Sequence, residues 1–120
     1  MAYLRIENTA RQTVLCHRAR RADSFGSRLR GLMFRRSLVP EDGLLLVPDW
    51  SIHTFFMRFP IDVLFLDTDW RVLSAYPSVP PWRVGPVHRG AYAVLELPPG
   101  TIARTNTHVG DSLSLQEIEQ

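Results

Sequence analysis

The apolar residues of this 120-residue chain fall in short runs that are separated by turn-forming residues. One run covers residues 44–47 and ends at Pro48, and two others, residues 52–59 and 61–67, flank Pro60. Short apolar or alternating runs bounded by Pro, Gly and Asp are typical of β-strands. Similar runs cover residues 3–7, 12–18, 71–76, 91–97 and 112–118. We therefore predict a mostly β, α+β fold, with residues 1–120 forming a single domain.

One segment, residues 22–36, has a helical period instead. Its apolar side chains recur at steps of three and four residues, namely Ala22, Phe25, Leu29 and Leu32 or Met33. Asp23 or Ser24 precedes the stripe as a plausible N-cap. The pattern predicts one amphipathic helix near the N-terminus, with this stripe against the core. A short helical turn is also predicted between Pro99 and Thr107.

The charge and cysteine content favour a cytoplasmic protein without a membrane partner. Cys16 is the single cysteine, so no internal disulfide can form. No apolar run approaches the length of about 18 residues that a membrane-spanning helix needs. All 14 basic residues are arginine, and 12 acidic residues leave a net charge of +2. We interpret this usage as a compositional bias rather than as a sign of anion recognition.

Four motifs, in a fixed order, resemble a known family. They are Ser24 and Arg28 followed by Gly31-Leu32-Met33-Phe34-Arg35, then Gly43-Leu44-Leu45, then residues 53–67 beginning His53-Thr54-Phe55-Phe56, and finally Val94-Leu95-Glu96-Leu97 with Gly100 and Gly110-Asp111. In order and spacing the chain is similar to the uncharacterised bacterial and archaeal domain of unknown function 192. The resemblance implies a compact, partly open β-barrel-like domain that carries one helix. It implies no activity, because the family has none established.

Residues 53–62 are the richest in side chains that could carry chemistry. If this segment is extended, His53, Phe55 and Met57 share one face and Arg58 lies on the other. Asp62 falls among leucines in the next run, where a carboxylate needs an arginine or several backbone N–H groups. A catalytic role for Asp62 and a buried structural network are both open, and we favour the structural role.

Residues 77–90 are predicted to form a long irregular loop, because six of them are proline or glycine. Glu96 faces away from its leucine neighbours, toward either solvent or a cleft. We predict that an unknown small molecule binds in a cleft between the 53–62 strand pair and this loop, with Phe55 and Trp82 as apolar walls. The candidate ligand-binding residues are His53, Phe55, Met57, Arg58, Asp62, Trp82, Arg83, His88 and Glu96.

Two alternatives from other functional classes stay open. The first is a hydrolase-type enzyme that uses Asp62 with His53, and the second is a nucleic-acid or protein-binding module that uses the arginines between Arg18 and Arg36. Nucleic acid is the less favoured partner, since no known nucleic-acid motif accompanies the charge. We predict no metal site, because the histidines and Cys16 lack zinc-ligand spacing, and no cofactor. Catalysis, ligand identity and oligomeric state are not specified by the sequence.

Overall fold

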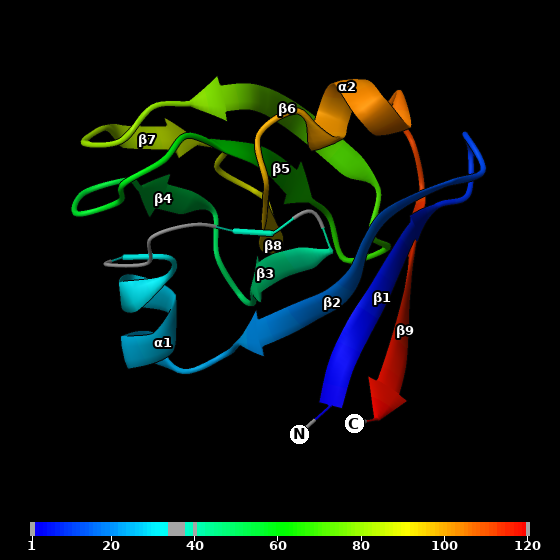
Figure 1. Ribbon diagram of the computed structural model, residues 1–120, viewed down its shortest axis with the longest axis horizontal. Helices are drawn as coiled ribbons and strands as arrows, with labels where there is room; N and C mark the ends of the chain where they lie inside the picture. Colours follow the sequence, from blue (N-terminus) through cyan, green and yellow to red (C-terminus); the bar gives the residue numbers. More distant parts are fainter. Residues whose placement is uncertain (1, 34–37, 40, 120) are drawn as a thin grey trace.

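The structure, a computed structural model, describes residues 2–33, 38–39 and 41–119. Nine strands and two short helices form within these residues (Figure 1). In chain order they are β1 (Ala2–Asn8), β2 (Thr13–Ala22), α1 (Phe25–Arg30), β3 (Asp42–Leu46), β4 (Ser51–His53), β5 (Ile61–Leu66), β6 (Val72–Val79), β7 (Val84–Val87), β8 (Ala93–Leu97), α2 (Thr101–Thr105) and β9 (Leu113–Glu119).

Seven of these strands form one sheet in the order β6-β5-β8-β3-β2-β1-β9, and β4 pairs with β7 in a second, small sheet. Strands β2 and β3 are parallel, which is possible because the segment containing α1 connects them. The edge strands β6 and β9 approach each other at one end through a bridge between Arg71 and Ser112. The mostly β prediction is confirmed. The sheet curls but does not close, so the barrel-like description fits only loosely.

The large sheet buries side chains on both faces. Strand alternation places Leu95 and Leu97 of β8 on one face and Val94 on the other, and the two faces build two separate core clusters. The first cluster is rich in residues of β1, β2 and the centre of the sheet, including Ile6, Leu15, Leu45, Leu64 and Leu95. The second packs under α1 and β4 and includes Leu32, Leu46, Ile52, Met57, Val63 and Phe65. The side chains on both faces of the central strands β5 and β8 are therefore buried.

The prediction of a long amphipathic helix is wrong in length and in packing. Residues 18–22 extend β2, where they pair with β3, and α1 covers only Phe25–Arg30. No residue of α1 is buried, and the side chains of Phe25 and Leu29 are 75% and 56% exposed. The Ser24 N-cap is confirmed, since its Oγ accepts the Ser27 N–H at 3.1 Å. The end of the predicted helix, residues 34–36, lies outside the described residues.

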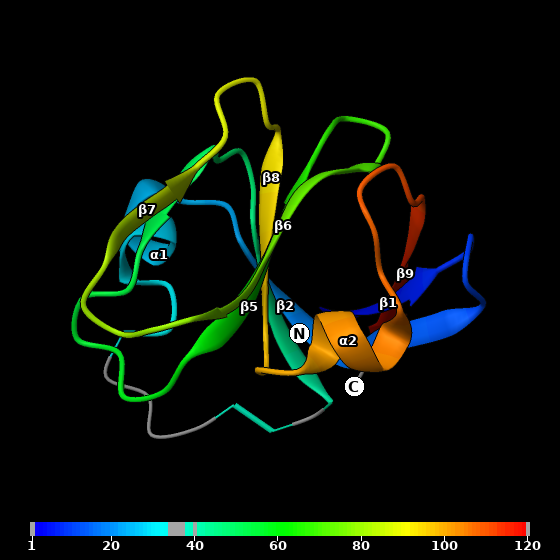
Figure 2. The same cartoon turned by 90° about the horizontal axis from the view of Figure 1, so that it is seen from above.

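Two further predictions are corrected around the small sheet. The predicted strand over residues 52–59 stops at His53, because Thr54 turns the chain: its carbonyl accepts the Met57 and Trp82 N–H groups. The predicted loop over residues 77–90 contains the end of β6 and all of β7, which pairs with β4. In Figures 1 and 2, α1, β4 and β7 lie together at one end of the molecule and α2 lies at the other.

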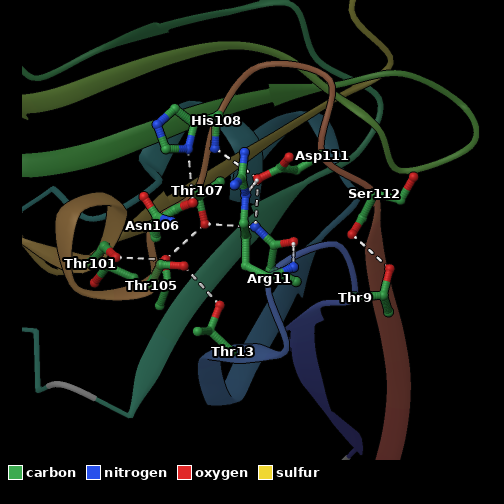
Figure 3. Close-up of polar contacts among 11 residues, drawn as sticks. Thr9, Arg11, Thr13, Thr101, Thr105, Asn106, Thr107, His108, Asp111 and Ser112 are labelled. Carbon is green, nitrogen blue, oxygen red and sulfur yellow. Dashed lines mark hydrogen bonds and ion pairs between the residues drawn. The ribbon is translucent and has the colours of Figure 1, made fainter.

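A buried polar network stabilises the α2 end (Figure 3). Asp111 Oδ2 accepts hydrogen bonds from Asn8 Nδ2 at 3.0 Å, Arg11 Nε at 3.1 Å and the His108 N–H at 2.9 Å. Asn8 Nδ2 also donates to Thr107 Oγ1 at 3.0 Å. Burial raises the pKa of Asp111, but these hydrogen bonds outweigh it and hold the pKa below its ordinary value. The network joins the β1–β2 turn to the loop before β9, which gives the Gly110-Asp111 motif a structural role.

Candidate functional site

A cavity of about 590 Å³ lies beneath α1, between that helix, the β3–β4 connection, β4 and β8. Its volume is in the range of roughly 300–1,000 Å³ that is typical of small-molecule sites. Its walls are mainly apolar and aromatic: Phe25, Leu29, Leu32, Met33, Leu46, Pro48, Trp50, Ile52, Met57, Val84, Ala91 and Tyr92. The remaining lining residues are Arg28, Arg30, Gly31, Asp49, Ser51, His53 and Glu96.

The exposure of the α1 side chains follows from this cavity. Phe25 and Leu29 are spaced four residues apart, so both lie on one face of the helix, and that face lines the cavity rather than packing into the core. Their helical spacing is a sequence signal for this wall. Spacing alone does not distinguish a face that packs on the core from one that borders a cavity.

Glu96 is the buried polar group of the cavity. In β8 it stands opposite Leu44 on one side and Val63 on the other, so its side chain lies on an otherwise apolar face of the sheet. The residue is 2% exposed, and Oε1 has no hydrogen-bond partner among the described residues. Burial raises the pKa of this carboxyl to about 8, with a further contribution from the nearby Asp49 carboxylate. At neutral pH the cavity therefore contains a mostly protonated, uncharged carboxyl group.

His53 connects the small sheet to the helix above the cavity. Its Nε2 lies 3.1 Å from the Leu29 carbonyl oxygen, and its Nδ1 accepts the Phe55 N–H at 3.2 Å. These two contacts together assign the ring proton to Nε2, which donates to Leu29. His53 thereby holds the last turn of α1 over the cavity.

The charged groups of the cavity differ in sign. Arg28 and Arg30 of α1 line it from the helix, and Arg28 Nη1 donates to the Asp23 carbonyl at 2.7 Å. Asp49 lies in the β3–β4 connection, where its Oδ1 accepts the N–H groups of Trp50 and Ser51 at 2.9 and 3.3 Å. With Glu96 protonated, two arginines and one aspartate are the charged residues that line the cavity.

Three of the nine predicted site residues, His53, Met57 and Glu96, line this cavity. Phe55 and Trp82 do not line it; their ring centroids lie 6.2 Å apart. Arg83 lines a second cavity of about 380 Å³ between residues 76 and 86. Among the described residues no buried, unpaired side-chain atom faces that second cavity, since Glu96 alone carries one. Arg58 is exposed.

Asp62 lies on the opposite face of the sheet from Glu96, because it pairs with Leu97, the next residue of β8. Its Oδ1 accepts the Ser78 N–H at 2.9 Å and its Oδ2 the Ile102 N–H at 2.8 Å. Asp62 thus ties β6 and the first turn of α2 to β5. The partners are backbone N–H groups, one of the two arrangements that the sequence analysis required.

The other histidine and carboxylate candidates do not converge either. His88 Nδ1 lies 2.8 Å from Ser74 Oγ, and the His88 ring is 5.9 Å from that of Phe65. Because Asp62 and His53 have separate partners, the pair that a hydrolase would need is not formed. Within residues 2–33, 38–39 and 41–119, no three His, Cys, Asp or Glu side chains gather as metal ligands would.

The arginines between Arg18 and Arg36 divide among different parts of the molecule. Arg18, Arg20 and Arg21 are exposed on β2, and the Arg18 guanidinium lies 5.2 Å from the centre of the Tyr3 ring. Arg28 and Arg30 belong to the cavity, whereas residues 35 and 36 lie outside the described residues. The described arginines therefore lie in two places, on β2 and at the cavity.

The family assignment rests on a match over nearly the whole fold. The model of DUF192, described as an uncharacterized ACR, matches residues 6–115, from β1 to β9. The chain belongs to the DUF192 family. An UPF0127 protein of Thermococcus sibiricus is 32% identical over 94% of this chain and 75% of its own length. An UPF0127 protein of Pyrococcus furiosus is 37% identical over 77% of this chain and 81% of its own length.

Two crystal structures share the DUF192 chain's fold. A protein of unknown function from Novosphingobium aromaticivorans has a TM-score of 0.81 and 25% identity, with 93% of this chain and 83% of that chain covered. A Sinorhizobium meliloti protein described as a putative transcription regulator has a TM-score of 0.83 and 24% identity, with 96% and 94% covered. No described helix of the DUF192 chain is long and apolar enough to cross a membrane.

Proposed function

We propose that this DUF192 protein binds a small, largely apolar molecule in the cavity beneath α1, with Glu96 as the polar group that fixes its orientation. The single observation that carries the proposal is the buried Glu96 Oε1 without a hydrogen-bond partner among the described residues. A buried polar atom that lacks a partner costs the fold about 1–3 kcal/mol. A ligand that supplies the missing hydrogen bond would recover part of that cost.

The apolar walls supply the rest of the expected affinity. Trp50 and Phe25 are large apolar side chains that are 47% and 75% exposed, and both line the cavity. A ligand that covered them would remove apolar surface from water, which is favourable by about 25 cal/mol per Å². No comparable contact supports a hydrolase based on Asp62 and His53, or nucleic-acid binding by the arginines. A cytoplasmic location remains part of the proposal.

The test uses the uncharged fluorophore N-phenylnaphthylamine, whose emission rises in an apolar environment. We expect saturable binding to the wild-type protein. Ala91 lines the cavity and is only half-buried, so Ala91→Trp should fill part of the space and weaken the binding at least about tenfold. Ala103 is exposed on α2, at the other end of the molecule, and Ala103→Trp is the matched control.

Circular dichroism and thermal unfolding establish that both variants keep the fold. Equal affinity of the Ala91→Trp and Ala103→Trp variants for the fluorophore, or no binding to the wild-type protein, would overturn the proposal.

A further inference from the structure

The charges that surround the cavity restrict the kind of ligand that it can hold. Arg28 and Arg30 reach it from α1, His53 from β4, and Asp49 from the β3–β4 connection, while Glu96 lies inside it on β8. On the strands that flank β8, the residues opposite Glu96 are Leu44 and Val63, which carry no charge. Tyr92, whose phenol is also titratable, is a further lining residue of the cavity.

A charged ligand of either sign meets at least one residue of like charge at this cavity. A cation must approach Arg28 and Arg30, and an anion must approach Asp49, because all three residues line the cavity. Inside an apolar cavity a charge that is not fully compensated is costly, because it loses its hydration. An uncharged ligand avoids both penalties.

The hydrogen-bonding groups of Glu96 restrict the class of ligand further. A protonated carboxyl offers one O–H donor and one carbonyl acceptor, about 2 Å apart, and a partner with the complementary pair can form two hydrogen bonds with it. Primary amides, lactams and ureides carry such a pair, an N–H group on the same side as a carbonyl oxygen, without a net charge. Both oxygens of Glu96 would then have partners.

We infer that the ligand of this cavity is an uncharged molecule with an apolar body and an amide-like group, which pairs with the Glu96 carboxyl. This inference rests on the proposed function, because it names the ligand class of the same cavity. It assigns Glu96 as the residue that determines specificity, with Arg28 and Arg30 disfavouring cations and Asp49 disfavouring anions.

The test compares three ligands that share a naphthalene body: naphthamide, which is uncharged; naphthoate, an anion; and naphthylmethylammonium, a cation. Isothermal titration calorimetry at about pH 6.5 should show naphthamide binding at least about tenfold more tightly than either charged ligand. Raising the pH should weaken naphthamide binding, by about tenfold at pH 9, because only the protein with a protonated Glu96 is competent to bind.

Three variants locate this preference at Glu96. Glu96→Gln keeps a donor and an acceptor, so it should retain naphthamide affinity within a few-fold and lose the pH dependence. Glu96→Leu keeps the volume without the polar atoms and should lose at least about tenfold in affinity for naphthamide. Glu117 is exposed on β9, and Glu117→Gln, the matched control, should behave like the wild-type protein.

The outcomes separate this inference from the proposed function. If N-phenylnaphthylamine binds in the cavity but the cation binds most tightly, or the three ligands bind equally, the inference is wrong and the proposed function stands. Loss of naphthamide binding in Glu96→Gln, with fluorophore binding intact, would also overturn the inference. If the fluorophore does not bind the wild-type protein, both the proposed function and the inference fail.

Discussion

Replacing Glu96 with glutamine tests the buried carboxyl without any ligand. Because burial raises the pKa of Glu96 to about 8 from an ordinary value of 4.5, the folded protein keeps this proton over a pH range in which the unfolded chain has lost it. Over that range the unfolded chain binds fewer protons than the folded one, so the free energy of unfolding decreases as the pH rises. Glu96 thus destabilises the fold at neutral pH. Glutamine has nearly the same shape and does not titrate.

The size of the effect follows from the two pKa values. Each pH unit between them changes the free energy of unfolding by about 1.4 kcal/mol. Between pH 4.5 and pH 7 the contribution of Glu96 therefore falls by about 3 kcal/mol. Because Glu96 is 2% exposed, solvent screening does not reduce this figure substantially. Above about pH 8 the folded protein also ionises, and the difference stops growing.

The assay is urea-induced unfolding of the wild-type protein and of Glu96→Gln at several pH values from about 4.5 to 9. We expect the stability of Glu96→Gln, relative to the wild-type protein, to increase by about 3 kcal/mol between pH 4.5 and pH 7 and to level off above pH 8. Glu117→Gln should show no such increase. A difference that is constant between pH 4.5 and pH 7 would refute the reasoning, because it would mean that folding does not raise the pKa of Glu96.

Three further predictions concern other parts of the molecule. Asp62→Asn leaves one of the two N–H groups that donate to the buried Asp62 without an acceptor, so we expect a loss of about 1–3 kcal/mol and a lower melting temperature. An unchanged or higher melting temperature would contradict the structural role of Asp62. Leu29→Ala should lower the free energy of unfolding by about 1 kcal/mol or less, because Leu29 is 56% exposed. A shift of the denaturant midpoint equivalent to several kcal/mol would show instead that α1 packs on the core. The lowered pKa of Asp111 stabilises the fold fully above the ordinary pKa of 3.8, and this stabilisation is lost as the pH falls through the pKa of the folded protein. The free energy of unfolding should therefore decrease less steeply with falling pH in Asp111→Asn than in the wild-type protein. An equally steep decrease in both proteins would count against the network.

Local sequence patterns were sufficient to predict most strands and the facing of their side chains. Alternation placed Asp62 with the leucines of its run and Glu96 away from Leu95 and Leu97, and both placements are correct, because side chains of a strand point to alternate faces whatever the strand pairs with. The same rule, with the order β5-β8-β3, puts Asp62 and Glu96 on opposite faces. Asp62 and Glu96 therefore cannot belong to one site, although they lie on neighbouring strands.

The main error of prediction from local sequence patterns concerned the helix over residues 22–36. The helix was predicted to begin at Ala22, but Ala22 ends β2, where it pairs with Leu46 of β3, a partner from another part of the chain. Phe25 and Leu29 have the spacing of a helix face, but apolar spacing does not specify what the face contacts. Only the position of α1 over β4 and β8 turns that face into the wall of a cavity.

The sequence by itself therefore determined the family, the mostly β composition and the facing of the two buried acids. The tertiary structure decided what surrounds each acid. Asp62 meets two N–H groups from residues 78 and 102, whereas Glu96 meets apolar side chains of β3 and β5 and a cavity bordered by α1. The physical reason is that the pKa and the hydrogen bonding of a buried carboxyl depend on the groups within a few ångströms of it, and here those groups come from segments far apart in the chain.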